Sequence, residues 1–349
     1  MRSGREPSDI ERRKNEHIDI CLRENVNGTG GGTGLDRYWF RHNALPEISF
    51  AAIDTSAVFL GRPLKVPLLV SSMTGGTEEA GRINRRLAAA AERRGWAMAL
   101  GSGRAALERP DTAGSFRVRE AAPTVPLLAN LGAVQLALGY GADECRRLLD
   151  ITGADALVLH LNGLQEVFQP EGDTDFGGLL KRIETLCRAS EKPIGVKEVG
   201  WGLDGETVVR LLEAGVAFVD VAGAGGTSWT EVEKRRARTD PVRRRAAEAF
   251  AGWGIPTADC IVEARRAAPS ACIVGSGGLA GGLDAAKALA LGADLAGFGR
   301  SLLASAAESD ERLDERLAVV EFELRAAMFG IGAANVHALQ ATDRLVRIG

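Results

Sequence analysis

Residues 67–76 read PLLVSSMTGG, an apolar run that ends in a polar, glycine-rich segment. The same pattern recurs seven more times along the chain, and each run ends in a chemically different segment. These segments are GSGR (101–104), NLG (130–132), HLNGLQE (160–166), VKEVG (196–200), VAGAGGTSW (221–229), GSGG (275–278) and GFGR (297–300). Eight strands that each deliver polar groups to one rim are how a (β/α)8 barrel builds an active site.

Most of the apolar runs are continuous rather than alternating, which is typical of strands covered on both faces. We expect strands at 67–72, 97–101, 126–130, 155–161, 193–198, 217–222, 271–276 and 294–298. Helical spacing occurs at 78–95, 143–153, 176–191, 206–215 and 283–293, with a closing helix at 308–332. This order predicts parallel strands joined by right-handed crossovers. The expected fold class is α/β, a TIM barrel with an N-terminal extension.

The 349 residues leave room for one barrel with extensions. We expect residues 1–66 to form an extension that packs on the barrel, and residues 67–349 to form the barrel itself. The extension would contain a disordered start at 1–10, a basic helix at 11–24, a glycine-dense loop and short strands.

The sixth crossover, from about 223 to 270, is the longest and contains the basic stretch EKRRARTDPVRRRAAEAF. Runs of charge usually mark exposed faces, so a solvated helix pair is favoured over a phosphate-binding role.

The composition of the chain limits which functions and cellular locations we expect. The formal net charge of −3 gives no general attraction to nucleic acid or to anionic membranes. No stretch has the roughly 18–20 apolar residues of a membrane span, and the start lacks the apolar core of a secretory signal, so we expect a cytoplasmic protein. The five cysteines lack metal-site spacing and are expected to be reduced packing thiols: Cys21, Cys145, Cys187, Cys260 and Cys272.

GSGG and GFGR end the seventh and eighth runs, where barrels commonly bind phosphate. Glycine there lets backbone N–H groups approach phosphate oxygens, and a helix N-terminus adds positive potential. Arg300 would complete this cradle. The alternative is a pair of tight turns, which their placement at the two expected strand ends disfavours.

Lys197 follows an apolar run, so its side chain would lie in the barrel mouth. One interpretation is a salt bridge to Glu198 or another carboxylate, because ammonium groups are rarely buried alone. The other is a cation beside the electron-rich edge of a flavin or other anionic ligand. Polar ends of other strands would converge on the same ligand: Ser72, Thr74, Asn130, Thr227 and Ser228.

HLNGLQE is the most specific segment. His160 and Asn162 are two residues apart and share one strand face, while Gln165 and Glu166 enter the following loop. A lone histidine is usually a satisfied core group, but three polar companions favour a site. Glu166 would hold Mg²⁺ bridged to a diphosphate, because magnesium takes one or two carboxylates plus phosphate oxygens and water. The alternative for Glu166 is an acid stabilised by a helix N-terminus.

Positive charge that would meet a diphosphate comes from Arg104 and from Arg13, Lys14 and His17 near the N-terminus. Arginine forks suit phosphate oxygens. Taken alone, RRKNEH is equally consistent with the solvated basic start of a helix.

These segments, in this order, resemble the type 2 isopentenyl-diphosphate delta-isomerases, a family of FMN-dependent barrels. The resemblance runs from about residue 12 to the C-terminus and includes RKNEH, HNALPE (42–47) and the segments above. It implies that FMN is bound by Ser71, Ser72, Met73, Thr74, Ser102, Asn130, Lys197, Thr227, Gly277, Gly278, Gly299 and Arg300. It implies that substrate is bound by Arg13, Lys14, His17, Ser102, Gly103, Arg104 and Gln165. It also implies a catalytic set of His160, Asn162 and Gln165, with Glu166 as the magnesium ligand.

The resemblance also implies the reaction, the interconversion of isopentenyl and dimethylallyl diphosphate in isoprenoid biosynthesis. A proton is added at one carbon and another is removed elsewhere, around a carbocation-like state. Family members need reduced FMN, usually reduced by NAD(P)H, together with Mg²⁺, and they form homotetramers or homo-octamers. The expected partner is a small diphosphate substrate, with no nucleic acid and no membrane.

Two positions depart from the family pattern. The family commonly has GSQR where this chain has GSGR, so Gly103 removes a side chain near the expected diphosphate site. Gly299 and Arg300 also differ from the smaller residues often found there. Both departures bear on substrate affinity and identity.

Three other protein classes fit this sequence less well. A flavin oxidoreductase of the hydroxy-acid oxidase type needs a catalytic histidine late in the barrel, and this chain has no histidine between 161 and 336. An inosinate-type dehydrogenase needs a cysteine where this chain has AGAGGTSW. A flavin-binding homologue without catalysis is disfavoured by the intact HLNGLQE, because a binder needs no magnesium ligand.

Overall fold

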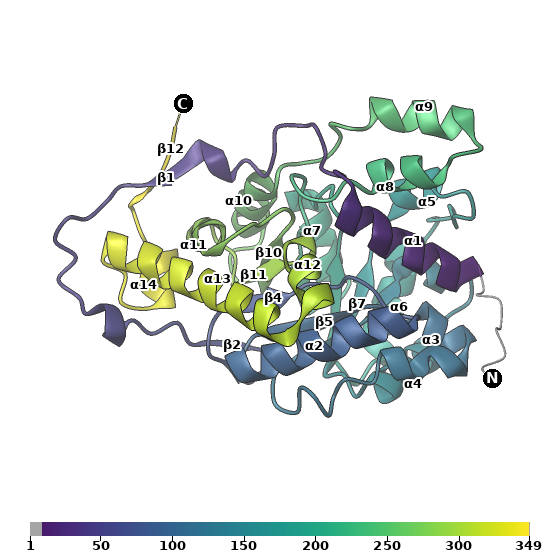
Figure 1. Cartoon of the computed structure of the whole chain (residues 1–349), viewed down its shortest axis with the longest axis horizontal. Helices are drawn as coiled ribbons and strands as arrows, with labels where there is room; N and C mark the ends of the chain where they lie inside the picture. The colour runs from purple at the N-terminus through teal and green to yellow at the C-terminus, as the bar shows by residue number, and fades with distance from the viewer. Residues whose placement is uncertain (1–8, 349) are drawn as a thin grey trace.

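The structure, a computed structural model, describes residues 9–348. Its centre is a closed barrel of eight parallel strands that follow one another around the ring in chain order (Figure 1). The strands are β4 (Leu68–Val70), β5 (Ala97–Ser102), β6 (Leu127–Gly132), β7 (Ala156–His160), β8 (Ile194–Lys197), β9 (Phe218–Asp220), β10 (Ile273–Ser276) and β11 (Leu295–Phe298). Pairing of β11 with β4 closes the ring. The predicted TIM barrel and its eight strands are confirmed.

Helices surround the barrel and bury their apolar faces against it. They are α2 (Glu78–Arg94), α4 (Ala142–Thr152), α6 (Leu179–Ala189), α7 (Gly205–Glu213), α10 (Thr257–Ala267), α11 (Gly282–Ala290), α12 (Arg300–Glu308) and α13 (Asp310–Ile331). The six predicted helices correspond to α2, α4, α6, α7, α11 and α13. The closing helix begins at Asp310 because the Ser309 side chain accepts a hydrogen bond from the Arg312 N–H and caps it. Shorter pieces are α3 (Arg104–Glu108), α5 (Gly163–Phe168), α14 (Val336–Gln340) and the 3-10 turns η1 (Leu35–Arg37), η2 (Phe50–Ala52), η3 (Pro110–Ser115) and η4 (Ala133–Leu136).

A hairpin seals the amino-terminal end of the barrel. It consists of β2 (Ala57–Phe59) and β3 (Arg62–Leu64), which pair antiparallel. Phe59 enters the barrel interior and packs edge-on against Phe218 at 5.2 Å between ring centroids. A Cβ atom at Gly195 would overlap the Phe218 ring, so glycine there makes room for this plug. Ligands can therefore reach the barrel interior only from the carboxyl ends of the strands.

The N-terminal helix α1 (Asp9–Arg23) packs against α8 (Trp229–Arg236) and α12 beside the barrel mouth (Figure 1). Of the expected disordered start, residues 1–8 lie outside the described residues, whereas residues 9 and 10 are already helical. The division into an extension over 1–66 and a barrel over 67–349 stays a prediction.

The sixth crossover contains two helices before α10, namely α8 (Trp229–Arg236) and α9 (Pro241–Ala249). Helix α9 is the solvated basic helix that was predicted, with Val242 76% exposed. The prediction is wrong for α8, because Glu233 is fully buried and the Arg236 side chain is only 9% exposed. Helix α8 packs under α1 and against α5, which removes its inner face from solvent.

Between residues 9 and 348, no helix is long and apolar enough to cross a membrane. The five cysteines are unpaired, as expected.

Candidate active site

A cavity of about 680 Å³ opens at the carboxyl ends of the strands, and residues at or just beyond the ends of all eight strands line it. Twenty of the predicted site residues surround this one space, on strand ends and loops and on α1, α3, α5 and α12, so Gln165 and Glu166 lie in a short helix and not in the loop that was expected. The twenty are Arg13, Lys14, His17, Ser71, Ser72, Met73, Thr74, Ser102, Arg104, Asn130, His160, Asn162, Gln165, Glu166, Lys197, Thr227, Gly277, Gly278, Gly299 and Arg300. The cavity includes neither Gly103 nor Ser228, and the prediction for Ser228 is wrong because its buried hydroxyl is 2.8 Å from Thr230 Oγ1 instead.

Gly103 lies beside the cavity but faces away from it. A Cβ atom at this position would overlap the side chain of Leu148, which is buried in α4. The expectation that Gly103 removes a side chain from the diphosphate site is therefore wrong. A side chain at this position would point away from the cavity and toward Leu148. The Gly103 backbone N–H donates to the Asn130 carbonyl at 2.7 Å and helps to fix the end of β5.

A chain of hydrogen bonds crosses the floor of the cavity. The Asn130 amide donates to Ser72 Oγ at 2.8 Å, so its Oδ1 faces His160 Nδ1 at 2.7 Å. Because an amide oxygen only accepts, His160 carries its proton on Nδ1 and leaves the Nε2 lone pair free. Burial, with the nearby charges of Lys197 and Lys14, lowers the pKa of His160 to about 3. His160 is thus a neutral hydrogen-bond acceptor rather than an acid.

Lys197 is buried at the end of β8 and donates to the Glu198 carbonyl at 2.5 Å. The Glu198 carboxylate turns instead to the backbone N–H groups of Gly200 and Trp201, at 2.6 Å each. The carboxylate that neighbours Lys197 is Asp220, its register partner on β9. Asp220 was not predicted, because a single acid at the end of a short apolar run has no distinguishing spacing.

The residues present fit a phosphorylated flavin. Four buried polar atoms in the described chain have no hydrogen-bond partner, and all four belong to the cavity wall: Ser71 Oγ, Thr74 Oγ1, Asn162 Oδ1 and Ser301 Oγ. Buried polar groups are normally paired, so these atoms indicate a polar ligand.

The phosphate end of such a ligand fits the loops after β10 and β11. Gly277 and Gly278 have left-handed φ angles of 112° and 78°, which glycine adopts without strain. The first N–H of α11, at Gly282, is already taken by the Glu323 carboxylate at 2.5 Å. The start of α12, with Gly299, Arg300 and Ser301, borders the cavity instead. Ser301 was missed because the sequence pattern ended at the preceding arginine.

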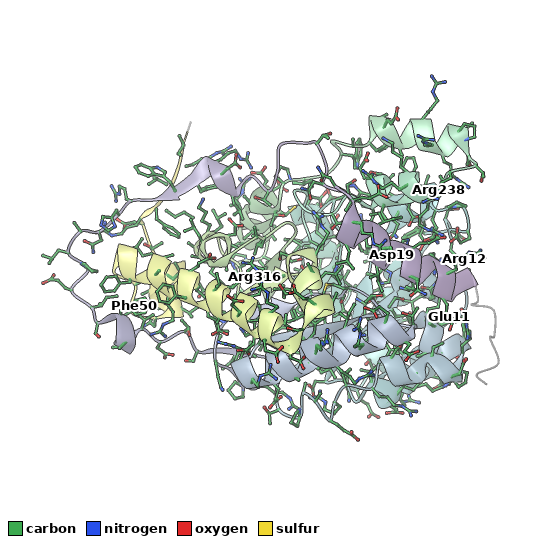
Figure 2. All side chains as sticks on the ribbon, in the orientation of Figure 1. Glu11, Arg12, Asp19, Phe50, Arg238 and Arg316 are labelled. Atoms are coloured by element: carbon green, nitrogen blue, oxygen red, sulfur yellow. The ribbon has the colours of Figure 1, made fainter. Side chains whose placement is uncertain are left out.

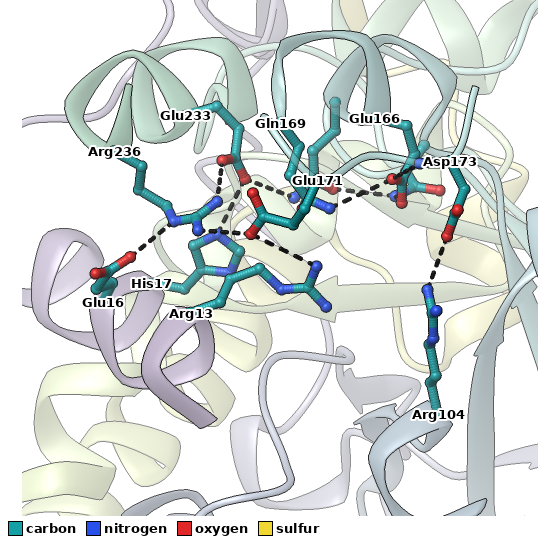
Figure 3. A network of polar contacts seen from close by, with 12 residues as sticks. Arg13, Glu16, His17, Arg104, Glu166, Gln169, Glu171, Asp173, Glu233 and Arg236 are labelled. Carbon is teal, nitrogen blue, oxygen red and sulfur yellow. Dashed lines mark hydrogen bonds and ion pairs between the residues drawn. The ribbon is translucent and has the colours of Figure 1, made fainter. Parts of the chain in front are cut away.

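The opposite wall carries positive charge from α1 and α3. Arg13, Lys14 and His17 all face the cavity, so the alternative of a solvated helix start is wrong for these three. Burial and the charge of Arg13 lower the pKa of Lys14 to about 8. Arg104 donates to Asp173 at 2.8 Å (Figure 3) and to Glu108 at 2.7 Å. Its guanidinium is therefore oriented before any ligand binds.

Glu166 lies next to this positive wall. Its Oε1 accepts from the Asn162 amide at 2.8 Å, and its Oε2 accepts from the Asp173 N–H at 2.8 Å. Burial raises the pKa of Glu166. No cluster of three or more metal-ligating side chains occurs in the part of the chain that the structure describes. A cation here would thus take Glu166, with the unpartnered Asn162 Oδ1 nearby, and complete its shell from ligand oxygens and water.

Helix α8 contributes residues that sequence reasoning missed. Glu233 accepts from His17 at 3.0 Å and from Gln165 at 3.2 Å, and its other oxygen accepts from Arg236 at 2.6 Å (Figure 3). Burial alone would raise the pKa of Glu233, but the hydrogen bond from His17 and the charge of Arg236 outweigh it and lower the pKa to about 2. The signal that was available is helical spacing, because Trp229, which lines the cavity, is one turn before Glu233.

Comparison with known proteins is consistent with this site. The FMN-dependent dehydrogenase family matches residues 162–346. An isopentenyl-diphosphate delta-isomerase of Oceanobacillus iheyensis is 53% identical over 340 residues, 97% of each chain. One of Nostoc sp. is 50% identical over 336 residues, 96% of each chain.

Solved structures with similar folds include a mandelate oxidase variant with a monooxide FMN adduct, at TM-score 0.66 and 19% identity over 98% of this chain and 100% of that one. A flavocytochrome b2 variant with pyruvate bound has TM-score 0.68 and 18% identity over 96% and 82%. These distant structures support the fold alone, whereas the relatives with about half of their residues identical support the family. The chain therefore belongs to the FMN-dependent, type 2 isopentenyl-diphosphate delta-isomerases.

Proposed function

We propose that this protein interconverts isopentenyl and dimethylallyl diphosphate, with reduced FMN and Mg²⁺ as cofactors. The observation that carries the proposal is the two-sided cavity. Its floor offers unpartnered polar atoms and glycine loops suited to a flavin, and its opposite wall offers oriented cations beside Glu166. A flavin on the floor and a diphosphate against that wall would leave the allylic carbons between them.

Flavin binding would use polar groups from several strand ends. Ser71 and Thr74 would supply hydroxyls, Lys197 a positive charge, and Gly277 and Gly278 the phosphate loop. The remaining proposed contacts are Ser72, Met73, Ser102, Asn130, Thr227, Gly299 and Arg300. When bound, reduced FMN would add and remove the protons of the double-bond shift, and these residues would orient its ring.

The protein's own groups would position the substrate and hold its protons. The free Nε2 of His160 accepts a hydrogen bond without adding positive charge near the carbocation-like centre. Asn162 and Gln165 lie beside it, and Gln165 is held by ionised Glu233. Arg104, already oriented by Asp173, would bind the diphosphate together with Arg13, Lys14 and His17.

The deciding experiment is anaerobic turnover by the purified chain. We expect a yellow protein that, once reduced, converts isopentenyl diphosphate to its allylic isomer, and that loses this activity on reoxidation. A yellow protein that leaves isopentenyl diphosphate unchanged would contradict the proposal and favour a flavin binder or an oxidoreductase.

Glu166→Gln tests the magnesium role separately. We expect the variant to need about tenfold more Mg²⁺ for half-maximal activity, since a neutral amide binds the cation more weakly. Glu184→Gln, on the exposed outer helix α6, is the matched control. An unchanged magnesium titration would refute the role of Glu166 and leave the isomerase activity standing.

Finer properties follow from the family likeness alone. We propose NAD(P)H as the reductant, a cytoplasmic location, a role in isoprenoid biosynthesis, and a homotetramer or homo-octamer. Anaerobic titration of the flavin with NADH and NADPH tests the first, and light scattering of the holoprotein tests the last.

A further inference from the structure

Arg236 joins three separate parts of the chain. Its Nε donates to Glu16 of α1 at 3.0 Å, and its two terminal nitrogens donate to Glu171 at 2.7 Å and to Glu233 at 2.6 Å (Figure 3). All three guanidinium nitrogens are therefore used, each toward a different carboxylate. The Arg236 side chain is 9% exposed, so these contacts are largely shielded from water.

Helix α1 has few apolar contacts to hold it in place. Apart from Ile18, its apolar anchor is a small cluster of Ile20, Val26 and Val232, with Cys21 and Trp229 at the edge. Only two apolar side chains of α1 itself, Ile18 and Ile20, are buried, so hydrophobic burial contributes little to the docking of this helix. Ion pairs can therefore decide how α1 sits over the cavity.

Each of the three carboxylates that Arg236 contacts lies close to other residues of the site. Glu16 is next to His17 and one turn from Arg13, both of which line the cavity. Glu171 is also 3.8 Å from Arg13, and it lies two residues before Asp173, which orients Arg104.

Glu233 is the third link. With one oxygen held by Arg236, its other oxygen is directed at His17 and Gln165. A carboxylate that is completely buried cannot keep this orientation and charge without its cation.

We propose that Arg236 is a positioning residue, which fixes α1 over the cavity and directs Glu233, and thereby sets the affinity for the diphosphate substrate. This inference rests on the proposed function. Through Arg236, helix α8 connects α1 with the loop that follows α5.

The test compares Arg236→Met with the wild-type holoenzyme. We expect the amides of residues 9–23 to exchange hydrogen about tenfold faster, because docking of α1 loses a shared cation. We also expect the KM for isopentenyl diphosphate to rise about tenfold, with a smaller change in kcat. Arg236→Lys should restore part of both effects, since it keeps one charge but reaches fewer carboxylates.

Glu16→Gln provides a milder variant in case Arg236→Met folds poorly. Glu16 is 44% exposed, so this change cuts only the link between Arg236 and α1. We expect faster exchange of α1 and a raised KM, both smaller than in Arg236→Met. Arg243→Met on α9, whose partner is Asp240 on the same helix, is the matched control and should change neither.

Unchanged α1 exchange or an unchanged KM in Arg236→Met and Glu16→Gln would overturn the inference. So would lower thermal stability and FMN content with a normal KM in the folded fraction, because that is the signature of a purely structural ion pair. Failure of the proposed function is distinguishable, because wild-type protein would then not isomerise the substrate, while the exchange measurement would still report on α1.

Discussion

His160 shows how one hydrogen bond fixes both the tautomer and the charge of a site residue. Its Nδ1 is committed to Asn130, and its pKa of about 3 keeps it neutral throughout the physiological range. Because protonation would bury a positive charge, and would place it near Lys197 and Lys14, His160 is harder to protonate in the folded protein than in the unfolded chain. Acid should therefore destabilise the protein through this residue.

The first prediction concerns this linkage. A histidine with a folded pKa below its unfolded value of 6.5 contributes stability that is complete above pH 6.5 and is lost as the pH falls toward 3. On lowering the pH from 7 to 5, the free energy of unfolding of the FMN-free protein should fall by about 1–2 kcal/mol more in wild type than in His160→Asn. Urea unfolding at both pH values measures this. Equal pH dependence in the two proteins would contradict the assigned pKa.

Gly103 supports a second prediction, which separates packing from binding. A Cβ atom at residue 103 would overlap Leu148, so Gly103→Ala should lower the free energy of unfolding by about 1–3 kcal/mol. Its KM should stay unchanged, because the new methyl group faces α4 and not the cavity. Shortening the neighbour with Leu148→Ala should make Gly103→Ala nearly harmless in a double-mutant cycle. A raised KM with normal stability would show that residue 103 faces the substrate after all.

At the scale of elements, the barrel strands were predictable because each carries a continuous apolar run and a polar end. Both signals are local, and parallel strands buried on two faces have little freedom to deviate from them. The same locality made the site residues on strand ends predictable, including Lys197 and His160. Convergence of eight strand ends is a property of the barrel, so no distant contact had to be guessed.

Helix α8 could not be predicted in this way, because its composition and its position give opposite indications. Its basic residues are typical of an exposed helix, yet α1 and α5 cover its inner face and bury Glu233. Besides Arg236 on the same helix, the partners of Glu233 are 68 and 216 residues away along the chain. Asp220 was missed for a related reason, since its neighbours Lys197 and Ser276 are on other strands. Buried polar pairs between elements leave no periodicity in the sequence.

Packing between α11 and α13 yields a third prediction. A Cβ atom at Gly282 would overlap the Val320 carbonyl and the Leu324 N–H of α13, both of which are rigid helical backbone. Gly282→Ala should thus force the helices apart and lower the free energy of unfolding by about 3 kcal/mol. Gly114→Ala is the control, because nothing lies within 4 Å of its Cβ position, and it should change stability by less than about 0.5 kcal/mol. Equal thermal stability of the two variants would contradict the close packing of α11.

At the scale of the whole molecule, two segments of the N-terminal extension lie at opposite ends of the barrel. The β2–β3 hairpin fills the bottom through Phe59, and α1 borders the mouth. Between them, Phe50 of the extension lies beside the closing helix α13 (Figure 2), where its ring packs against Phe322 and Phe329. Arg325 of α13 donates to the carbonyl groups of Phe50 and Ile53, and Asp54 forms a backbone bridge with Asn335. The extension is thus held at several independent points.

A further attachment point joins the extension to the C-terminal strand and can be removed alone. Strand β1 (Tyr38–Phe40) pairs antiparallel with β12 (Leu345–Arg347), side by side in Figure 1. A two-stranded ribbon is marginal by itself, so β1 depends on its partner for order. Arg41, whose N–H donates to the Arg344 carbonyl at 2.8 Å, depends on the same pairing.

Deletion of residues 345–349 should therefore open the chain around β1 and leave the rest folded. We expect trypsin to cut the variant at Arg41 at least about tenfold faster than wild type, since local opening limits cleavage of a folded segment. Lys65, which follows β3, should stay protected, because its N–H donates to the Gly95 carbonyl at 3.1 Å and its carbonyl accepts from Thr55 Oγ1 at 2.9 Å, and FMN content should be unchanged. Val346→Thr, which preserves the strand and its backbone hydrogen bonds, is the matched control and should resist cleavage like wild type. Early cleavage at Lys65, or loss of flavin, would show instead that the pairing of β1 with β12 supports the whole barrel.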